Sequence, residues 1–318
     1  MAAEAVIASL ARRGNTKIFG CNIHPYEWTA ASRLVDRFYQ VPPARDCDAY
    51  IASLIEICRQ AKVTHVIALT DPEVDVLSEN SDRFSAIGTL LCTPPAGSVK
   101  KARDKLEIYN IFKSDIHIKP IPTFNSGDPG VLGLDFPLIA KPRNGRSSEG
   151  KIDLMDKKSL EFWRQRLPVE QYIIQPRIEG SIFVTDIVFD KTNNMAAWLT
   201  RQELLRTANG AGITVRIHPD HPCGKMAWIV SERLGLTGCV NIEFLVSGDE
   251  IFLMDVNPRF SAGVAFSLRA GYDMIDNHLR CFTGENILPP PAVADAIYTK
   301  GFLEYAISNG ENHETRKP

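Results

Sequence analysis

The sequence predicts a mixed fold, in which an α/β domain with a parallel sheet is followed by a larger α+β part with antiparallel strands. In the first 95 residues, short apolar runs alternate with amphipathic segments, of which 48–61 is the clearest. This alternation is typical of a parallel sheet with helices on both faces. Further along, apolar runs at 181–190 and 195–200 flank a polar turn, and a second hairpin pattern spans 239–263. Neighbouring runs joined by such turns indicate antiparallel strands.

The individual elements follow from apolar periodicity and from residues that end helices or bias the backbone. The expected helices are 1–14, 29–38, 48–61, 72–84, 98–113, 158–167, 226–234, 264–270 and 272–283. The expected strands are 17–22, 63–70, 87–93, 136–142, 152–155, 181–190, 195–200, the two arms of the hairpin and a last strand near 298–306. The run 118–124 is expected to be an extended linker, because proline biases its neighbours away from helix.

Length and composition describe an ordinary globular protein. The chain has 318 residues, of which 44% are hydrophobic and 23% charged, with a net charge of -2. It can bury a substantial core in two or three domains. No basic surface for nucleic acid is expected, and the longest apolar runs are far shorter than the roughly 20 residues of a membrane helix. The seven cysteines are scattered and no signal peptide is recognisable. We therefore expect reduced thiols and a cytoplasmic location.

The hairpin at 239–263 carries several oxygen ligands on neighbouring strands. Asp255 and Asn257 are two residues apart and share a strand face, and Glu243 can join them across the hairpin. Two carboxylates and an amide oxygen suit a hard cation such as Mg²⁺ that carries a phosphate-bearing substrate. Arg259 follows two residues later and could hold a phosphoryl group with its fork of donors. From the residues alone, a solvated hairpin is the alternative, since Asn-Pro commonly starts a turn.

A second candidate site centres on Lys141. The apolar run 136–142 delivers this lysine to the start of a loop, 143–150, whose small residues include Ser147 and Ser148. A lysine followed by backbone amides that can fold over phosphates is what nucleotide binding requires. No P-loop is present, because the lysine precedes the glycines and no G-K-[ST] occurs.

These two motifs resemble those of the ATP-grasp superfamily, in the form seen in carbamoyl-phosphate synthase large subunits, biotin carboxylases and carboxylate-amine ligases. In that family a Glu and a Glu-x-Asn-x-Arg hold Mg²⁺ against the ATP phosphates. Glu243, Asn257 and Arg259 match this pattern, and Asp255 stands where the family usually has Glu. The resemblance implies a metal held by the two carboxylates and the amide. It also implies a catalytic role for Arg259 at the transferring phosphoryl group.

The same resemblance implies the nucleotide contacts. Lys105, in an Asp-Lys pair like the one that opens the ATP-grasp domain, and Lys141 would bind the phosphates, and Lys141 would take part in catalysis. Ser147 and Ser148 would belong to the lid over them. An exposed helix lysine is the alternative for Lys105.

The resemblance places the adenine at the hinge between the two lobes, with Gln175, Arg177 and Ile178 as its contacts. The family commonly has a ribose-binding Glu at the position of Ile182. Glu179 is the candidate substitute.

The resemblance also implies the domain order and the activity. Residues 1–95 would form a pre-ATP-grasp domain without the family's usual first strand. Residues 96–180 would form the N-terminal lobe of the ATP-grasp domain, and 181–318 its C-terminal lobe. The implied enzyme is an ATP-dependent ligase that uses Mg²⁺, with Mn²⁺ as the other candidate ion, and activates a carboxylate as an acyl phosphate for attack by an amine. Its partners would be these small molecules, and a homodimer is left open.

Two alternatives to this activity remain. An ATP-binding protein without turnover is favoured by Asp255, by Ile182 and by the missing first strand. A carboxylase or carbamoyl-phosphate type of enzyme would use bicarbonate, although no set of biotin-pocket residues is evident.

Two further groups of charged residues are candidates for substrate contacts. Asp71, Glu73 and Asp75 could hold a cationic substrate, but an ordinary helix start is the favoured interpretation, because acidic residues stabilise that end of the helix dipole. Arg201 and Arg206 lie where related enzymes place contacts to the acyl phosphate or the acceptor. Surface arginines are the alternative there.

Overall fold

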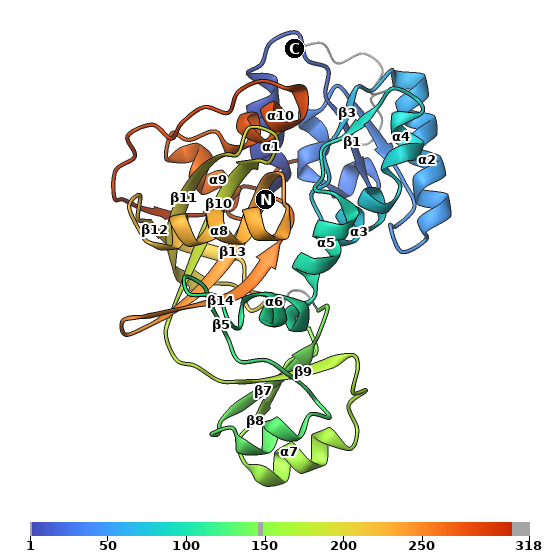
Figure 1. Cartoon of the computed structure of the whole chain (residues 1–318). Helices are drawn as coiled ribbons and strands as arrows, with labels where there is room; N and C mark the ends of the chain where they lie inside the picture. Colours follow the sequence, from blue (N-terminus) through green and yellow to red (C-terminus); the bar gives the residue numbers. More distant parts are fainter. Residues whose placement is uncertain (1, 146–148, 307–318) are drawn as a thin grey trace.

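The computed structural model describes residues 2–145 and 149–306. An N-terminal α/β domain lies beside a large sheet that has helices on both faces, and a smaller lobe projects from the two (Figure 1). This arrangement confirms the predicted α/β domain followed by a two-lobed α+β part.

The N-terminal domain contains two parallel strand pairs. β1 (Phe19–Asn22) pairs with β2 (Arg37–Gln40), and β3 (His65–Val66) pairs with β4 (Leu90–Leu91). Helices α2 (Cys47–Ala61), α3 (Asp71–Glu79) and α4 (Ser81–Ser85) pack on them. The core that they enclose includes Tyr50, Leu54, Leu77 and Phe84. The predicted parallel pairing is therefore confirmed, in strands shorter than expected.

Two expectations in this domain are wrong. The segment 29–38 is not a helix, because a short 3-10 turn, η2 (Ala30–Leu34), leads directly into β2. Backbone pairing with β1 overrides the local pattern there. The segment 72–84 is two helices, because the backbone of Asn80 leaves the helical conformation between α3 and α4.

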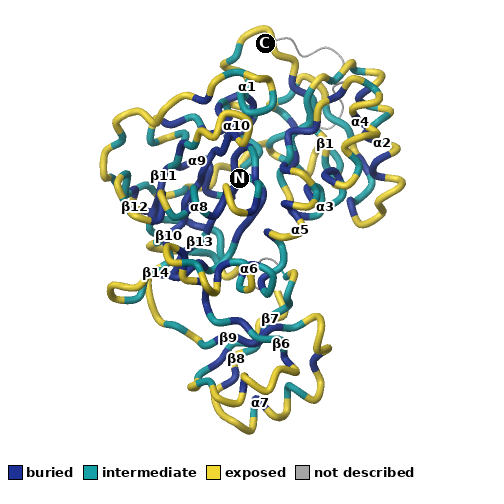
Figure 2. Tube along the Cα trace, in the orientation of Figure 1, coloured by how far each residue is buried: buried dark blue, intermediate teal, exposed yellow. Residues whose placement is uncertain are grey.

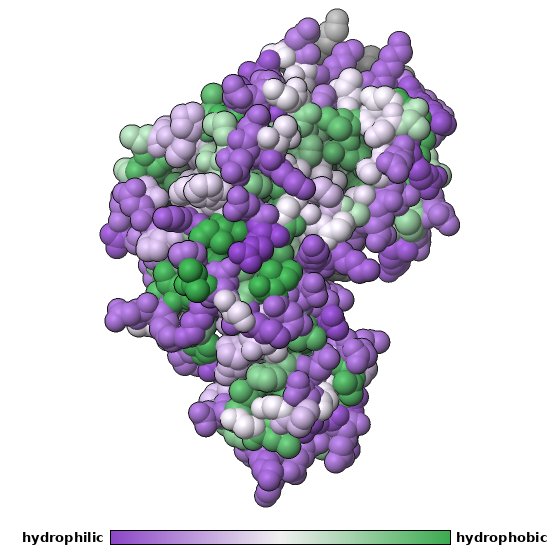
Figure 3. Space-filling view, viewed as in Figure 1, coloured by the Kyte–Doolittle hydropathy of each residue, from purple (hydrophilic) through white to green (hydrophobic). Residues whose placement is uncertain are grey.

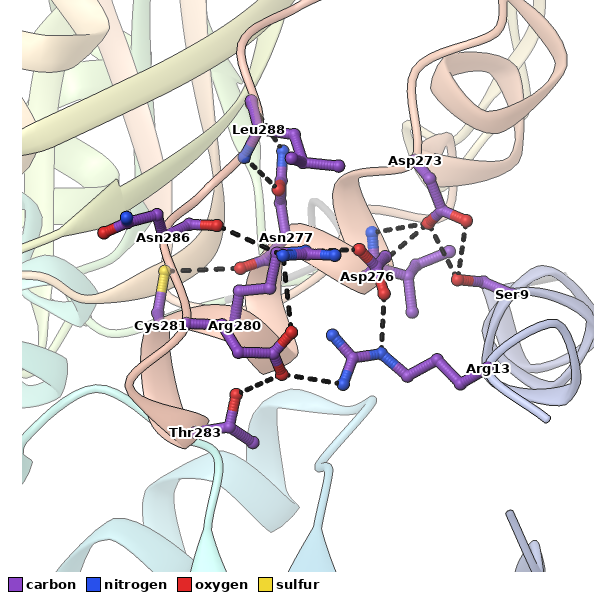
Figure 4. A network of polar contacts seen from close by, with 12 residues as sticks. Ser9, Arg13, Asp273, Asp276, Asn277, Arg280, Cys281, Thr283, Asn286 and Leu288 are labelled. Carbon is purple, nitrogen blue, oxygen red and sulfur yellow. Dashed lines mark hydrogen bonds and ion pairs between the residues drawn. The ribbon is translucent and has the colours of Figure 1, made fainter. Parts of the chain in front are cut away.

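The first helix, α1 (Ala2–Ala11), packs on the far part of the chain. Its residues Ala5 and Val6 join the core formed by α9 (Val264–Arg269) and α10 (Met274–Thr283). Ser9 Oγ donates to both carboxylate oxygens of Asp273, at 2.7 and 2.8 Å. Arg13 Nε lies 2.6 Å from Asp276 Oδ1, in the network drawn in Figure 4. The N-terminal helix is thus fixed to the large-sheet part by both apolar and charged contacts.

The expected helix 98–113 is two helices, α5 (Ala96–Arg103) and α6 (Lys105–Phe112). Asp104 separates them with an extended backbone, and its Oδ1 accepts from the N–H groups of Leu106 and Glu107, each at 3.0 Å. Asp104 is therefore the N-cap of a new helix. As a result, Lys105 is the first residue of α6.

The small lobe has a four-stranded antiparallel sheet in the order β6, β9, β7, β8. These strands and their helix are β6 (Phe124–Asn125), β7 (Leu138–Pro142), β8 (Ile152–Leu154), β9 (Tyr172–Pro176) and α7 (Lys157–Arg164). Leu138, Leu154, Leu160 and Ile174 form its core. The predicted lysine strand is therefore a central strand of this lobe.

In the described part of the chain, the large sheet has seven strands. From one edge to the other they are β15 (Ile297–Thr299), β12 (Gly212–Ile217), β11 (Met195–Arg206), β10 (Ser181–Asp190), β13 (Gly238–Ser247), β14 (Glu250–Asn257) and β5 (Lys119–Pro120). All neighbours pair antiparallel except β14 and β5. The strand predicted at 181–190 is confirmed. Strand β12 was not foreseen, and β5 lies in the segment expected to be a linker.

The two faces of this sheet have different neighbours. One face packs against α8 (Cys223–Leu234), and Ile187 and Val240 lie in that core. The other face packs against α1, α9 and α10 through Val188, Leu199 and Cys239. Because side chains alternate along a strand, the even-numbered residues of β10 and the odd-numbered residues of β11 and β13 point to this second face. The tube in Figure 2 shows that these central strands are the most buried part of the molecule.

The surface is mainly hydrophilic. On the face seen in Figure 3, apolar side chains form separate patches among polar ones. Within the described residues, no helix combines the length and the apolar character that crossing a membrane requires. All seven cysteines lie in the described part of the chain and are unpaired, as expected.

Candidate active site

A cavity of about 440 Å³ lies between the small lobe and the second face of the large sheet. The small lobe contributes Lys141 and Lys151, and α6 contributes Lys105. Strands β13 and β14 contribute Glu243 and Asp255 from the opposite side. Lysines from one part of the chain therefore face carboxylates from another.

The register of the β13/β14 hairpin determines the acidic side of the cavity. Glu243 is directly opposite Asp255, and Asn241 is directly opposite Asn257. A bulge follows, because Phe244 pairs with Leu253 and leaves Met254 as an extra residue. Bulges are frequent beside functional sites, where they redirect side chains. The structure thus brings the three residues of the predicted metal set together.

Glu243 is held by two neighbours. Arg206 Nη2 lies 3.0 Å from Glu243 Oε2, and Asn257 Nδ2 donates to Glu243 Oε1 at 3.4 Å. Burial raises the pKa of Glu243, and the charge of Asp255 raises it further, while Arg206 lowers it. Two carboxylates therefore stand close together, and Glu243 is the more buried of the two.

The lysines are oriented toward this acidic pair. Lys105 Nζ donates to the backbone oxygen of Gly145 at 2.8 Å and lies 3.6 Å from Asp255 Oδ1. Burial lowers the pKa of Lys141 to about 8, and the nearby charge of Lys105 contributes to the decrease. Asp255 and Glu243 act in the opposite direction on Lys141. An anionic ligand would therefore meet two closely spaced ammonium groups.

Arg259 lines the cavity and is fixed by the N-terminal domain. Its Nε and Nη2 each lie 2.7 Å from a different oxygen of Asp71, a bidentate pair. Arg103 Nη1 is a further partner of Asp71, at 3.1 Å from Oδ1. Glu73 forms a capping box with Thr70. The helix-start interpretation is therefore correct for this acidic segment, and Asp71 additionally orients Arg259.

The hinge residues have varied surroundings. Gln175 is buried, donates to Thr123 Oγ1 at 2.7 Å, and lines a second cavity of only about 10 Å³. The N–H of Arg177 donates to Pro137 O at 3.0 Å, and the Arg177 side chain pairs with Glu179.

Ile178 packs with Ile182 beside a small apolar cluster. Among the described hinge residues, neither Arg177, Ile178 nor Glu179 lines one of these two cavities. The predicted lid residues Ser147 and Ser148 lie outside the described residues.

A buried charged group that the sequence only partly indicated lies beside this site. Arg201, named above only as a loose candidate, pairs with Asp186 at 2.6 Å and with Glu203 Oε1 at 3.1 Å. Its Nη2 also donates to Ser261 Oγ at 3.1 Å. Asp186 and Glu203 were not among the predicted site residues. The sequence could have indicated this group through its two charged residues at positions 201 and 203, because residues two apart on a strand share one face.

The acidic hairpin fits a divalent cation. Burial and Asp255 both disfavour the charged form of Glu243, so a cation between the two carboxylates would relieve their repulsion. The Asn257 amide adds a neutral oxygen of the type that Mg²⁺ accepts. Within the described residues, no group of three or more His, Cys, Asp or Glu side chains could hold a metal ion. The candidate ligands are therefore two carboxylates and one amide.

Two family models match the chain. The model of the PylC-like N-terminal domain matches residues 5–92, and the model of the ATP-grasp domain matches residues 102–263.

Similar proteins include pyruvate carboxylase of Staphylococcus aureus, which is 22% identical over 269 residues, or 74% of this chain and 22% of that protein. The carbamoyl phosphate synthase large chain of Clostridium acetobutylicum is 20% identical over 256 residues, or 75% of this chain and 24% of that protein. The chain thus spans about a quarter of the length of these relatives.

Solved structures support the fold. The biotin carboxylase of Campylobacter jejuni has a TM-score of 0.74 at 14% identity, covering 92% of this chain and 71% of that one. The N5-carboxyaminoimidazole synthetase of Staphylococcus aureus in complex with ADP has a TM-score of 0.69 at 14% identity, covering 93% and 77%. Because the ATP-grasp model spans half of the chain, including the lysine strand and the acidic hairpin, this protein belongs to the ATP-grasp family.

Proposed function

We propose that this protein is an ATP- and Mg²⁺-dependent ligase that activates a carboxylate as an acyl phosphate and joins it to an amine, with release of ADP and phosphate. The observation that carries the proposal is the cavity in which Lys105 and Lys141 face Glu243 and Asp255. Such a site can bind a polyphosphate together with a divalent cation. The family membership supports the same activity.

Each charged group has a proposed role. Lys105 and Lys141 bind the phosphates of ATP, and Lys141 remains close to the group being transferred. Glu243, Asp255 and Asn257 hold Mg²⁺, or Mn²⁺ in its place, and the ion neutralises phosphate charge that would repel an incoming carboxylate. Phosphoryl transfer depends mainly on such positioning and electrostatic stabilisation.

Arg259 is the proposed catalytic arginine. Its bidentate pair with Asp71 holds the guanidinium at the cavity wall, at 2.7 Å for both contacts. A fixed donor needs little reorganisation when negative charge develops on the transferring phosphoryl group. Arg259 therefore stabilises that group and the acyl phosphate that follows.

The adenine is proposed to bind beside the hinge, near Gln175. The cavity there is only about 10 Å³, so binding of the base requires the hinge region to open. Arg177, Ile178 and Glu179 remain proposed contacts of the nucleotide in that opened form, as do Ser147 and Ser148 for the phosphates.

The test is a two-step measurement on the purified protein. Isothermal titration with a non-hydrolysable ATP analogue, with and without Mg²⁺, measures the nucleotide site, and metal-dependent binding is expected. ADP release is then measured across a matrix of carboxylates and amines. Release that needs one carboxylate and one amine together supports the ligase. Metal-dependent binding without release for any pair would instead favour an ATP-binding protein without turnover.

A bicarbonate-using enzyme is the second candidate, because solved structures similar to this one include biotin carboxylases. That activity predicts ADP release that depends on bicarbonate and needs no amine.

One similar solved structure is described as a domain dimer. The mass of the protein in solution therefore tests whether it is a homodimer. The cytoplasmic location remains a prediction.

A further inference from the structure

One carboxylate oxygen beside the cavity has no partner among the described residues. The Glu203 side chain is only 3% exposed, and it lines the same cavity as the metal hairpin. Its Oε1 accepts from Arg201 Nε at 3.1 Å. Its Oε2 is buried without a hydrogen-bond partner in the described part of the chain. Such an oxygen is costly in a folded protein unless a ligand satisfies it.

Oε2 of Glu203 is packed against the neighbouring strand, with no cation of the described residues bound to it. Gly212, on the neighbouring strand β12, also lines the cavity, and a Cβ at that position would lie 2.0 Å from Oε2. The nearby cation Lys300 is engaged elsewhere, because its Nζ donates to the backbone oxygens of Gly212 and Ala262 at 2.9 and 2.8 Å. Any side chain at position 212 would therefore displace the Glu203 carboxylate, which fits beside β12 only because residue 212 is glycine.

Glu203 is also close to the proposed reaction centre. Burial raises the pKa of Glu243, and the negative charge of Glu203 raises that pKa further. The pairing of the strands also places Glu203 near Glu243. Val184 of β10 pairs with Arg201 on one side and with Glu243 on the other, and Glu203 is two residues after Arg201. A group bound at Glu203 would thus lie next to the metal hairpin.

We propose that Glu203 Oε2 binds the ammonium group of the amine substrate and accepts its proton, an inference that rests on the proposed ligase function. An ionised carboxylate can only accept hydrogen bonds, so it repels both phosphate and carboxylate substrates. Those anions already have Lys105, Lys141 and Arg259 as partners. The substrate that carries N–H donors and a positive charge is the amine.

Attack by the amine on the acyl phosphate requires a base that removes a proton from the ammonium group. An ammonium group has no free electron pair, so one proton must leave before the nitrogen can attack, and Glu203 takes it. The C–N bond then forms, the C–O bond to phosphate breaks, and its electron pair leaves with the phosphate. A second nitrogen proton ends on that phosphate. No oxidant or further co-reactant is needed.

The first experiment tests the cation site without turnover. Crystals of the full chain are soaked in thallium(I), a monovalent cation similar in size to ammonium that is located by anomalous scattering. A peak in contact with Glu203 Oε2 is expected in the wild type and in Glu161→Gln, a matched change at an exposed carboxylate on α7. The peak is expected to disappear in Glu203→Gln. A wild type without this peak, or a Glu203→Gln crystal that keeps it, would overturn the proposal.

The second experiment separates binding of a charged amine from general damage to the site. ADP release is measured with ammonium chloride, and with hydroxylamine, which is uncharged at neutral pH, as acceptor. Glu203→Gln should lower kcat/KM for ammonium by roughly 100-fold or more, since general bases contribute factors of this order. The KM for ATP and the rate with hydroxylamine should change far less. Equal losses with both acceptors, or none with ammonium, would overturn the assignment of the base.

The two proposals fail in different ways. If the wild type releases no ADP with any carboxylate, the ligase function fails, while the thallium peak still decides whether Glu203 is a cation site. If the wild type turns over and Glu203→Gln uses ammonium equally well, the ligase function stands and the role of Glu203 fails.

Discussion

Asp255 is the side chain on which the metal proposal depends most directly. It faces Glu243 across the hairpin and lines the cavity. Asp255→Asn keeps the size of the side chain and removes one charge. We expect ADP release to fall by roughly 100-fold or more, because a lost charge at a catalytic metal costs several kcal/mol of transition-state stabilisation. The melting temperature should change little.

The matched control is Asp249→Asn in the exposed turn of the same hairpin. Both proteins are compared by ADP release and by thermal unfolding. Near-normal turnover of Asp255→Asn would remove Asp255 from the metal site.

Lys141 gives a pH-dependent prediction. Burial lowers its pKa to about 8, so the free protein loses this charge as the pH rises through that value. Affinity for a non-hydrolysable ATP analogue should therefore weaken about tenfold between pH 7 and pH 9, if the charged form binds. Lys141→Arg should remove the dependence, because a guanidinium stays charged throughout.

Isothermal titration at the two pH values measures this effect. Lys158→Arg, at an exposed lysine of α7, is the control and should behave as the wild type. The interpretation fails if the wild-type affinity is constant across this range.

The sequence indicated the acidic hairpin but not the full site. Glu243, Asp255 and Asn257 were found because strand alternation and a single short turn fix their relative positions. Glu203 could not be recognised, because its carboxylate fits beside the cavity only where the neighbouring strand has a glycine, Gly212. The pairing of Arg259 with a residue of another domain likewise has no local signal.

Among single helices and strands, the break at Asp104 is the clearest case of a side chain that determines local structure. Its carboxylate caps α6 and also pairs with Arg143, whose Nη2 lies 2.7 Å away. Asp104→Ala should lower the free energy of unfolding by about 1 to 2 kcal/mol, because it removes the cap. It should also weaken nucleotide binding, since Lys105 begins this helix.

The control is Asp104→Ser, which can still cap the helix but cannot form the ion pair with Arg143. Urea unfolding and titration with the ATP analogue are measured on both variants. If the serine variant is as unstable as the alanine variant, the ion pair, and not the cap, is the main contribution.

Helices and strands that are determined by neighbouring residues in the sequence were predicted correctly, and those that depend on other contacts were not. The strand at 181–190 was correct because its apolar run is long and bounded by turn residues. The helices at 29–38 and 98–113 were wrong for different reasons. The first is overridden by pairing with β1, and the second is divided by a capping aspartate that an amphipathic pattern does not reveal. Strand β12 follows β11 after a short loop and pairs with it, but two register shifts between Glu203 and Arg206 interrupt the alternation that would indicate this hairpin. Its other partner, β15, lies far along the chain.

For the complete chain, His278 links the N-terminal domain to the large sheet. Its Nδ1 accepts from the N–H of Cys239 at 2.8 Å, and its Nε2 lies 3.1 Å from Cys92 O. The first contact fixes Nε2 as the protonated nitrogen, so the neutral ring satisfies both partners. Burial lowers the pKa of His278 to about 4, and the hydrogen bond to Cys92 O opposes part of this decrease.

This pKa predicts the acid stability of the protein. The unfolded chain binds the proton near pH 6.5 and the folded protein only near pH 4, so stability is complete above about pH 6.5 and falls as the pH decreases toward 4. The loss is about 3 kcal/mol. Urea unfolding at pH 7, 5 and 4 measures it. His278→Gln should show a smaller loss, whereas His24→Gln, at an exposed position, should match the wild type. Identical pH profiles for wild type and His278→Gln would contradict the assignment.

The contact between Asp71 and Arg259 has a consequence for recombination between relatives. These residues are 188 positions apart and belong to parts of the chain that two separate family models describe. A chimera that took its first 95 residues from another member of the family would take its residue at the start of α3 from that protein. Without a carboxylate there, the guanidinium of Arg259 would keep only its hydrogen bonds to Phe260 O and Asn257 Oδ1, at 3.0 and 3.5 Å, among its contacts with the described residues. The N-terminal domain can therefore be exchanged only for one that also places a carboxylate opposite Arg259, and we infer that natural variation at positions 71 and 259 is correlated.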